Sequence, residues 1–346
     1  MTTPPRTMLF NHDEFDHESV TFAHDPDTGL KAIIAVHNRR RGPAIGGCRM
    51  MAYPDEISAL TDVLRLSKGM TYKCAIGDIP FGGGKAVIMG DPATQKTPEL
   101  LRAMGTFVEQ LGGRYITSFD SGTTIDDIAV IGETTRHVGG IKPGAGNASA
   151  STAYGVLVCM REAVRIRLGA ETLSGLVVAI QGAGNVGSRL AKLVAEDGGR
   201  VVIADINQDL ALSVAESTGA ASVKADEILS MDCDVLAPCA LGAVFSADSV
   251  KQLTCPVICG GANNQLADNS VADELMERQV FYCPDYLANA GGIIDLHYQL
   301  NKPSRDALKA HLDRLAETLQ DCHAIAAEHR CSMASAADLI AEARFQ

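Results

Sequence analysis

The chain has 346 residues, of which 46% are hydrophobic and 21% are charged, so it can bury a core and disorder is not expected. At roughly 150 residues per domain, the length predicts two domains. The net charge of −12 disfavours nucleic-acid and anionic-membrane partners, because phosphate binding relies on clustered lysine and arginine.

The sequence has no apolar run near the ~20 residues that cross a bilayer, and residues 1–20 show no apolar signal-peptide centre. We therefore expect a cytoplasmic protein. The ten cysteines lie singly, with no CxxC pair and no histidine at metal-ligand spacing beside a cysteine pair. They are predicted to be buried free thiols, and no metal site is predicted.

The first half of the chain alternates strand and helix patterns. Residues 19–24 and 30–37 predict a hairpin with Gly29 in its turn, and a helical pattern starts at Asp55. A glycine-rich turn then leads into a strand at 85–89. A helix, a strand at 115–119 and a helix at 125–137 follow. Residues 139–151 are small and polar, which indicates a hinge or linker.

The second half has a regular rhythm of apolar strands separated by helical stretches. Continuous valine and isoleucine runs, without alternation, favour a parallel sheet that is covered on both faces. The expected strands are residues 176–181, 200–205, 233–239, 256–262 and 280–285. A long amphipathic helix is predicted at 304–328, with another near 334–344.

A dinucleotide-binding motif follows the first of these strands. Gly182 suits a tight turn, Gly184 lets the backbone approach a pyrophosphate, and Gly187 lets helix and strand pack closely. Asp205 ends the next strand, 18 residues after Gly187, where it would bind a ribose diol and repel a 2′-phosphate. The pattern therefore favours NAD over NADP. A structural glycine turn without a ligand is the alternative.

A second candidate site lies in the first half. Lys73 and Lys85 bracket a glycine-rich segment, and Asp120 ends the strand at 115–119, so these groups could share one crevice. A buried lysine near another cation is a plausible catalytic base. Either lysine could instead be a solvated surface charge, and Lys68 is a competing candidate for anion binding. The nine histidines carry no nucleophile–base pattern and are interpreted as surface or core residues.

Seven segments in order, from about residue 19 to about residue 340, resemble the Glu/Leu/Phe/Val amino-acid dehydrogenases, and most of all their leucine dehydrogenase branch. The segments are GPAIGGCRM (42–50), LRLSKGMTYK (64–73), IPFGGGKAVIMGDP (79–92), GGRYITSFDSGTT (112–124), APCALGAV (237–244), GGANNQL (260–266) and PDYLANAGGII (284–294). Phenylalanine, valine and tryptophan dehydrogenases are near relatives of that branch.

The resemblance implies an α/β fold with two domains and a cleft between them. Residues 1–141 would form an N-terminal α/β domain for substrate binding and oligomerisation, with the C-terminal helix at 328–346 packed back on it. Residues 142–327 would form a Rossmann NAD-binding domain. A homo-oligomer is expected, with an amino acid or 2-oxo acid and ammonia as its small-molecule partners.

The resemblance also implies residue roles. Lys85 and Asp120 match the catalytic pair, Lys73 matches the lysine that binds the substrate α-carboxylate, and Asn263 matches an asparagine near that carboxylate and the nicotinamide. The nicotinamide half of the cofactor site would include Thr152, Cys239, Ala240 and Asn289. Around the glycine turn, the cofactor site would include Gly182, Gly184, Asn185, Val186, Gly187, Asp205 and Ile206. The substrate pocket would include Ile45, Gly46, Gly47, Met70, Ser118, Ile293 and Leu296.

Substrate choice follows from one of these positions. Glutamate-specific relatives carry a lysine where this chain has Ile45, and a side-chain carboxylate without a partner there would lose several kcal/mol of solvation. A hydrophobic amino acid is therefore predicted, of the leucine, valine or isoleucine type, with an aromatic one (phenylalanine or tryptophan) as the alternative. A glutamate-type NADP enzyme and a non-catalytic NAD-binding regulatory protein are less favoured. The chain departs from the family pattern at Cys48, Ser118, Ser121 and Asp295.

The family reaction implies a sequence of steps. With the α-carboxylate on Lys73, hydride passes from the substrate Cα to C4 of the nicotinamide and leaves an iminium. Lys85, kept neutral by a cationic neighbour and by desolvation, activates the water that attacks this carbon. Asp120 shuttles protons while the carbinolamine collapses to oxo acid and ammonia. Closure of the two domains is expected to exclude bulk water.

Overall fold

The computed structural model describes residues 12–140, 148–240, 244–301 and 304–346. The chain divides into two compact units, Met1–Ala145 with Phe345–Gln346, and Gly146–Arg344. Of the predicted linker at 139–151, residues 141–147 lie outside the described residues, and the prediction is wrong for residues 148–151, which form the first turn of helix α4 (Ala148–Leu168). The predicted domain limits, the return of the C-terminal helix to the first domain and the cleft stay predictions.

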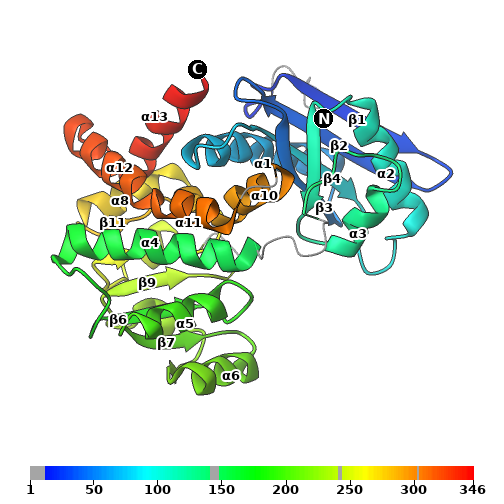
Figure 1. The fold of residues 1–346 in the computed structure, drawn as a ribbon. Helices are drawn as coiled ribbons and strands as arrows, with labels where there is room; N and C mark the ends of the chain where they lie inside the picture. Colours follow the sequence, from blue (N-terminus) through cyan, green and yellow to red (C-terminus); the bar gives the residue numbers. More distant parts are fainter. Residues whose placement is uncertain (1–11, 141–147, 241–243, 302–303) are drawn as a thin grey trace, which may run out of the picture. The chain divides into compact units, whose positions relative to one another are not determined.

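The first unit is built on a mixed sheet of five strands in the order β1-β2-β4-β3-β5 (Figure 1). The predicted hairpin is confirmed, since β1 and β2 pair antiparallel with Asp25 opposite Leu30. Strand β3 was not predicted, and it pairs parallel with β4 and β5. The elements of this unit are β1 (Ser19–Asp25), β2 (Leu30–Asn38), β3 (Ala44–Met51), α1 (Glu56–Ile76), β4 (Gly82–Met89), α2 (Pro98–Gln110), β5 (Tyr115–Phe119) and α3 (Ile125–Ile131).

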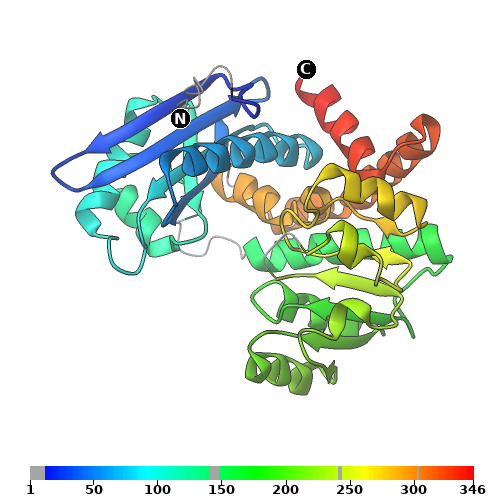
Figure 2. The ribbon, with the colours of Figure 1, turned by 180° about the vertical axis from the view of Figure 1, so that it is seen from behind.

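Helix α1 begins where the sequence predicts, because the Asp55 side chain accepts a hydrogen bond from the Ser58 N–H and caps it. Its buried residues pack on one face of the sheet, against Val87 of β4. Ala86 and Ile88, which point the other way, pack with residues of α2 and α3. Figures 1 and 2, seen from opposite sides, show α1 on one face and α2 and α3 on the other. Odd-numbered residues of β4 therefore face α1.

The second unit contains a six-stranded parallel sheet in the order β11-β10-β9-β6-β7-β8. From β6 the chain adds β7 and β8 on one side, and then β9, β10 and β11 on the other side. This is the strand order of a doubly wound dinucleotide-binding fold, and the point where the order reverses lies between β6 and β9. The parallel sheet predicted from the apolar runs is thus confirmed. Its strands are β6 (Val177–Gln181), β7 (Arg200–Ala204), β8 (Ala221–Ser222), β9 (Val235–Pro238), β10 (Val257–Ile258) and β11 (Phe281–Tyr282).

Helices surround this sheet, and two predicted helices, one in each unit, differ from the structure. The long helix expected at 304–328 is two helices, because Arg314 forms a tight turn in which its N–H bonds to the carbonyls of His311 and Leu312. In the first unit, α3 ends at Ile131 and not near 137. The helices are α4 (Ala148–Leu168), α5 (Gly187–Glu196), α6 (Gln208–Thr218), η2 (Ile228–Ser230), α7 (Ala247–Val250), α8 (Asn269–Glu277), α9 (Asp285–Ala288), α10 (Gly291–Asn301), α11 (Arg305–Asp313), α12 (Leu315–His329) and α13 (Met333–Phe345).

Long helices occur in both units, but none in the described ranges combines the length and apolar character that a bilayer span requires.

Candidate active site

The backbone of α1 lies directly on the glycine-rich strands of the first unit. A Cβ on Gly83 would stand 2.1 Å from the Thr71 backbone nitrogen, and a Cβ on Gly46 would stand 1.9 Å from the Gly84 carbonyl oxygen. Only glycine permits such close approach of main chains. Lys85 follows Gly83 by two residues, and Lys73 follows Thr71 by two residues. The two lysines therefore start from neighbouring stretches of backbone.

Lys85 and Asp120 are in contact. Lys85 is 5% exposed and, as an odd-numbered residue of β4, points toward α1, where its Nζ lies 3.1 Å from Oδ2 of Asp120. The same carboxylate oxygen accepts a hydrogen bond of 2.9 Å from Nε of Arg49 on β3. Arg49 also binds Asp62 of α1 at 3.0 Å, and the Tyr53 hydroxyl donates to Asp62. This places a second cation beside the Lys85–Asp120 pair.

The two cations determine the charge state of Asp120. Burial would raise the pKa of this carboxyl, but the charges of Lys85 and Arg49, together with their hydrogen bonds, bring the pKa below its ordinary value. Asp120 is therefore an ionised carboxylate at neutral pH. An ionised carboxylate in contact with a protonated lysine can take up a proton from it and later return the proton, as a proton shuttle requires.

The predicted pocket residues of the first unit lie around this cluster. Ser118 of β5 pairs with Gly47 of β3, and a Cβ on Gly47 would meet the Asp120 side chain at 2.7 Å. Ile45 is fully buried between Gly83 and Ile116. Met70 of α1 covers Gly46, with its Cγ 3.3 Å from the position of a Cβ there. The structure thus brings these predicted residues together. The competing candidate, Lys68, forms an ion pair of 2.9 Å with Asp16.

In the second unit, the glycine turn lies at the point where the strand order reverses. Gly182 follows β6 with φ of +102°, and a Cβ on it would meet the backbone of Cys239 and Ala240, which follow β9. A Cβ on Gly187 would stand 1.9 Å from the Gly182 carbonyl oxygen. Ligands of doubly wound sheets bind at such a switch point, outside the carboxyl ends of the strands. The turn therefore fits the pyrophosphate of a dinucleotide.

Asp205 is tied to the same turn. Its Oδ2 accepts a hydrogen bond of 2.7 Å from the Ala183 N–H, and its Oδ1 accepts one of 2.8 Å from the Asn207 N–H. The carboxylate is thus fixed at the end of β7, next to the glycine turn. Its neighbour Ile206 is 97% exposed. An apolar side chain held in water beside a dinucleotide turn is suited to cover the flat face of a base.

A second feature of this unit fits a nicotinamide. Asn289 is 4% exposed, and its Nδ2 donates to Oδ1 of Asn263 at 2.9 Å and to the Ala262 carbonyl at 3.2 Å. Its Oδ1 is buried without a hydrogen-bond partner in the part of the chain that the structure describes. A buried acceptor without a partner is costly, so a carboxamide N–H donor would be a suitable ligand for it. Thr152 of α4 lies beside the nearby start of α10, 2.9 Å from a Cβ position on Gly292.

Two protein-family models match this chain, one over most of each unit. Residues 17–137 match the Glu/Leu/Phe/Val dehydrogenase dimerisation domain, and residues 143–209 and 203–344 match Glutamate/Leucine/Phenylalanine/Valine dehydrogenase. The chain belongs to the Glu/Leu/Phe/Val dehydrogenase family. It is an amino-acid dehydrogenase, an oxidoreductase acting on the CH–NH2 group, and the family uses NAD(P). The dimerisation domain implies an oligomer.

Individual relatives differ in their substrates. The dehydrogenase is 44% identical to a leucine dehydrogenase of Bacillus subtilis over 84% of its own length and 81% of that protein. It is 40% identical to a phenylalanine dehydrogenase of Caldalkalibacillus thermarum over 96% and 92% of the two chains. The crystal structure of L-tryptophan dehydrogenase from Nostoc punctiforme matches with a TM-score of 0.83 and 37% identity, covering 95% of this chain and 96% of that one.

One departure from the family pattern, Asp295, has a structural role in the dehydrogenase. The side chain is 1% exposed and accepts hydrogen bonds from the Ser151 hydroxyl at 2.7 Å and from the Gln299 amide at 2.9 Å. It thereby ties α10 to α4. The predicted pocket residues on α10, Ile293 and Leu296, are 9% and 8% exposed. The connection thus lies in the same helix as both of these residues.

Sequence reasoning missed two groups of residues in the first unit. Arg49 lies within the GPAIGGCRM segment, but its contact with Asp120 joins two strands and cannot be read from spacing. The buried histidines His17 and His37 contact each other and α1. The sequence predicts them only as surface or core residues, and the structure places both in the core. Their contacts do not follow from the sequence, because the partners are 34 to 50 positions away.

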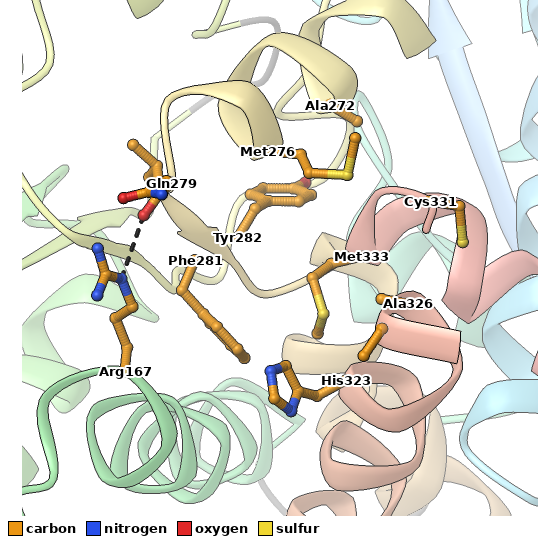
Figure 3. Close-up of a pocket in the computed structure, with 12 residues that line it drawn as sticks. Arg167, Ala272, Met276, Gln279, Phe281, Tyr282, His323, Ala326, Cys331 and Met333 are labelled. Atoms are coloured by element: carbon orange, nitrogen blue, oxygen red, sulfur yellow. Dashed lines mark hydrogen bonds between the residues drawn. The ribbon is translucent and has the colours of Figure 1, made fainter. Parts of the chain in front are cut away.

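A cavity of about 300 Å³ in the second unit lies apart from the dinucleotide turn (Figure 3). Phe281, Met276 and Met333 line it, and Arg167 at its rim donates a hydrogen bond to the Gln279 carbonyl. Gln279 precedes the amino end of the edge strand β11, whereas the glycine turn follows the carboxyl end of β6. None of the predicted site residues lines this cavity.

Proposed function

We propose that this dehydrogenase catalyses the NAD-dependent, reversible oxidative deamination of a hydrophobic L-amino acid to its 2-oxo acid and ammonia, with leucine, valine and isoleucine as preferred substrates. The observation that carries the proposal is the contact of the buried Lys85 with the half-buried Asp120 and Arg49 beside the glycine-rich strands. The cluster combines a lysine, an ionised carboxylate and a second cation. A lysine and a carboxylate in contact can serve as the general acid and base that oxidative deamination requires.

Each residue has a role in this proposal. Lys73 binds the substrate α-carboxylate. Lys85 passes its proton to Asp120, with which it is paired, and the neutral amine that results takes a proton from the water that attacks the iminium carbon. Asp120 exchanges protons with Lys85 as the carbinolamine loses ammonia, and Arg49 keeps Asp120 ionised between these transfers. The bound cofactor supplies the hydride acceptor.

The cofactor would be held by the second unit. The glycine turn from Gly182 to Gly187 would receive the pyrophosphate, and the Asn289 carboxamide would bind the nicotinamide carboxamide. Asp205 supports NAD in preference to NADP, because a fixed carboxylate repels a 2′-phosphate and accepts hydrogen bonds from a ribose diol.

Ile45 supports a hydrophobic substrate. The side chain is fully buried, so a substrate carboxylate placed against it would be desolvated without a cationic partner. Met70 and Ser118 complete a surface that is mostly apolar. The alternative of an aromatic substrate is favoured by the similarity to phenylalanine and tryptophan dehydrogenases.

The test is NADH formation with purified protein and a panel of L-leucine, L-valine, L-isoleucine, L-phenylalanine, L-tryptophan and L-glutamate, each with NAD and with NADP. We expect the highest kcat/KM for a branched aliphatic substrate with NAD. The Lys85→Ala protein, prepared identically, controls for contaminating dehydrogenases. A higher kcat/KM for an aromatic substrate would establish the alternative, and no turnover with any substrate would refute the proposal.

A further inference from the structure

The helix that carries Met70 and Lys73 is attached to the sheet by a buried histidine. His37 on β2 is 6% exposed, and its Nδ1 lies 2.8 Å from the Thr71 hydroxyl oxygen of α1. Its Nε2 lies 3.1 Å from Oδ1 of Asp16, whose Oδ2 accepts a hydrogen bond of 2.9 Å from Lys68. One imidazole therefore connects a carboxylate to a hydroxyl on the helix.

The chemistry of the partners sets the direction of these hydrogen bonds. The Asp16 carboxylate can only accept, so Nε2 of His37 carries a proton and donates it. In the neutral imidazole, Nδ1 then accepts, and the Thr71 hydroxyl is the donor. Burial lowers the pKa of His37, which keeps this neutral form at neutral pH.

The contact matters at this point of α1 because the sheet residue directly under Thr71 is a glycine. Helices normally keep their position on a sheet by interlocking side chains, but Gly83 offers none, and its Cβ position is 2.1 Å from the Thr71 nitrogen. Dispersion contacts with bare backbone restrain sliding only weakly. A directed hydrogen bond from the Thr71 side chain fixes both the height and the rotation of the helix at this point.

Lys73 lies two residues after Thr71, and Met70 one residue before it. We infer that His37, held by Asp16, is a positioning residue that acts through Thr71 to set where Lys73 and Met70 meet the amino-acid substrate. The inference rests on the proposed function, because it assigns the substrate contacts to these two residues.

The first variant is Thr71→Val, which has the same shape and lacks the hydroxyl. We expect the KM for the amino acid to rise roughly fivefold to tenfold, with kcat within about twofold of wild type and the KM for NAD unchanged. Thr71→Ser, which restores a hydroxyl, should bring the KM back toward the wild-type value.

Thr61→Val is the matched control. Thr61 lies on the same helix, and its hydroxyl contacts Nε2 of His12 at 3.1 Å, so this variant also removes a histidine–threonine contact, but near the start of α1. Its KM should equal that of wild type. Thermal unfolding of both variants shows whether they are equally folded. The same rise in KM for both would mean general weakening of the helix and would overturn the inference.

A double variant tests whether His37 acts through Thr71. His37→Gln keeps a donor toward Asp16 but has no acceptor in the place of Nδ1, so its KM should rise as in Thr71→Val. Adding Thr71→Val to it should cause no further rise. Additive effects, or an unchanged KM in Thr71→Val, would refute the inference while the wild type is active. A wild type that is inactive with every amino acid would refute the proposed function, and the inference with it.

Discussion

Nζ of Lys85 and Nε of Arg49 bind the same oxygen of Asp120, at 3.1 Å and 2.9 Å. A carboxylate held between two cations stays ionised, and either cation can be removed by mutation without removing the other. This arrangement allows the roles of the three groups to be separated experimentally.

Lys85→Ala should abolish turnover, because it removes the group proposed to activate water. The dinucleotide turn is in the other unit, so NAD should still bind with wild-type affinity. Steady-state NADH formation and NAD titration by calorimetry check the two halves of this prediction. Undiminished turnover would remove Lys85 from the mechanism.

Arg49→Gln should move the acidic limb of the kcat/KM–pH profile to higher pH, by about one pH unit. The charge of Arg49 lowers the pKa of Asp120, so its loss raises that pKa, and protonation begins at a higher pH as the solution is acidified. The profile is measured with the preferred amino acid and saturating NAD. A limb that stays in place would show that Asp120 is not the group titrating there.

Asp205→Ser should reduce the proposed preference for NAD over NADP by about tenfold or more, because it removes the negative charge that we propose faces the 2′ position. The measurement is the ratio of kcat/KM for the two cofactors. The control is Asp209→Ser, which changes an exposed acid four residues after Asp205, in the first turn of α6. This variant should leave the ratio unaltered. A constant ratio in both variants would contradict the assignment of Asp205.

Gly46→Ala and Gly69→Ala should have opposite effects on stability. A Cβ on Gly46 would overlap the Gly84 carbonyl, so the strands must separate, and the free energy of unfolding should fall by about 3 kcal/mol. Gly69 is exposed within α1 with no atom within 4 Å of its Cβ position, so alanine there should add ~0.5–1 kcal/mol through helix propensity. Urea unfolding measures both. Equal effects would contradict the close packing at Gly46.

Acidification from pH 7 to pH 5 should destabilise the fold through His17. Burial, followed by the charge of His37, lowers the pKa of His17 from about 6.5 to about 4. Between these values the unfolded chain binds more protons than the folded one, so stability falls as pH falls, by about 2 kcal/mol for this group at pH 5. Asp16 and Asp120 have lowered pKa values, and their contributions are lost only below the ordinary carboxyl range.

The check is urea unfolding of wild type and His17→Gln at pH 7 and pH 5. The variant should lose less stability than wild type over this interval. The same loss in both proteins would mean that His17 is not the titrating group.

Much of the fold followed from local patterns, and the exceptions have identifiable causes. The Asp55 cap, the hairpin at Gly29 and the apolar parallel strands are local signals, and the structure confirms them. Strand β3 was missed because Gly46 and Gly47 interrupt its apolar pattern. The break at Arg314 was missed because the amphipathic pattern continues through it.

The site shows the same limit. Lys85, Asp120 and the glycine turn stand in motifs, so the sequence could predict that the first two lie together and that the turn follows β6, as the structure shows; their roles stay predictions. Arg49 and His37 contact partners that only the folded chain brings near, Asp120 at 71 positions and Thr71 at 34 positions along the sequence. Contacts of this kind depend on strand order and helix placement, which single residues do not encode.

The glycine-rich crossing of β3, β4 and α1 restricts how this enzyme can diversify. This surface consists of main chain, and a side chain added at Gly46 or Gly83 would overlap neighbouring backbone atoms. Single substitutions at these glycines therefore cannot change its shape without disrupting the packing. Under the proposed function, new substrate ranges must therefore come from the proposed pocket residues at its border, Ile45, Met70 and Ser118, while the surface itself is inherited unchanged.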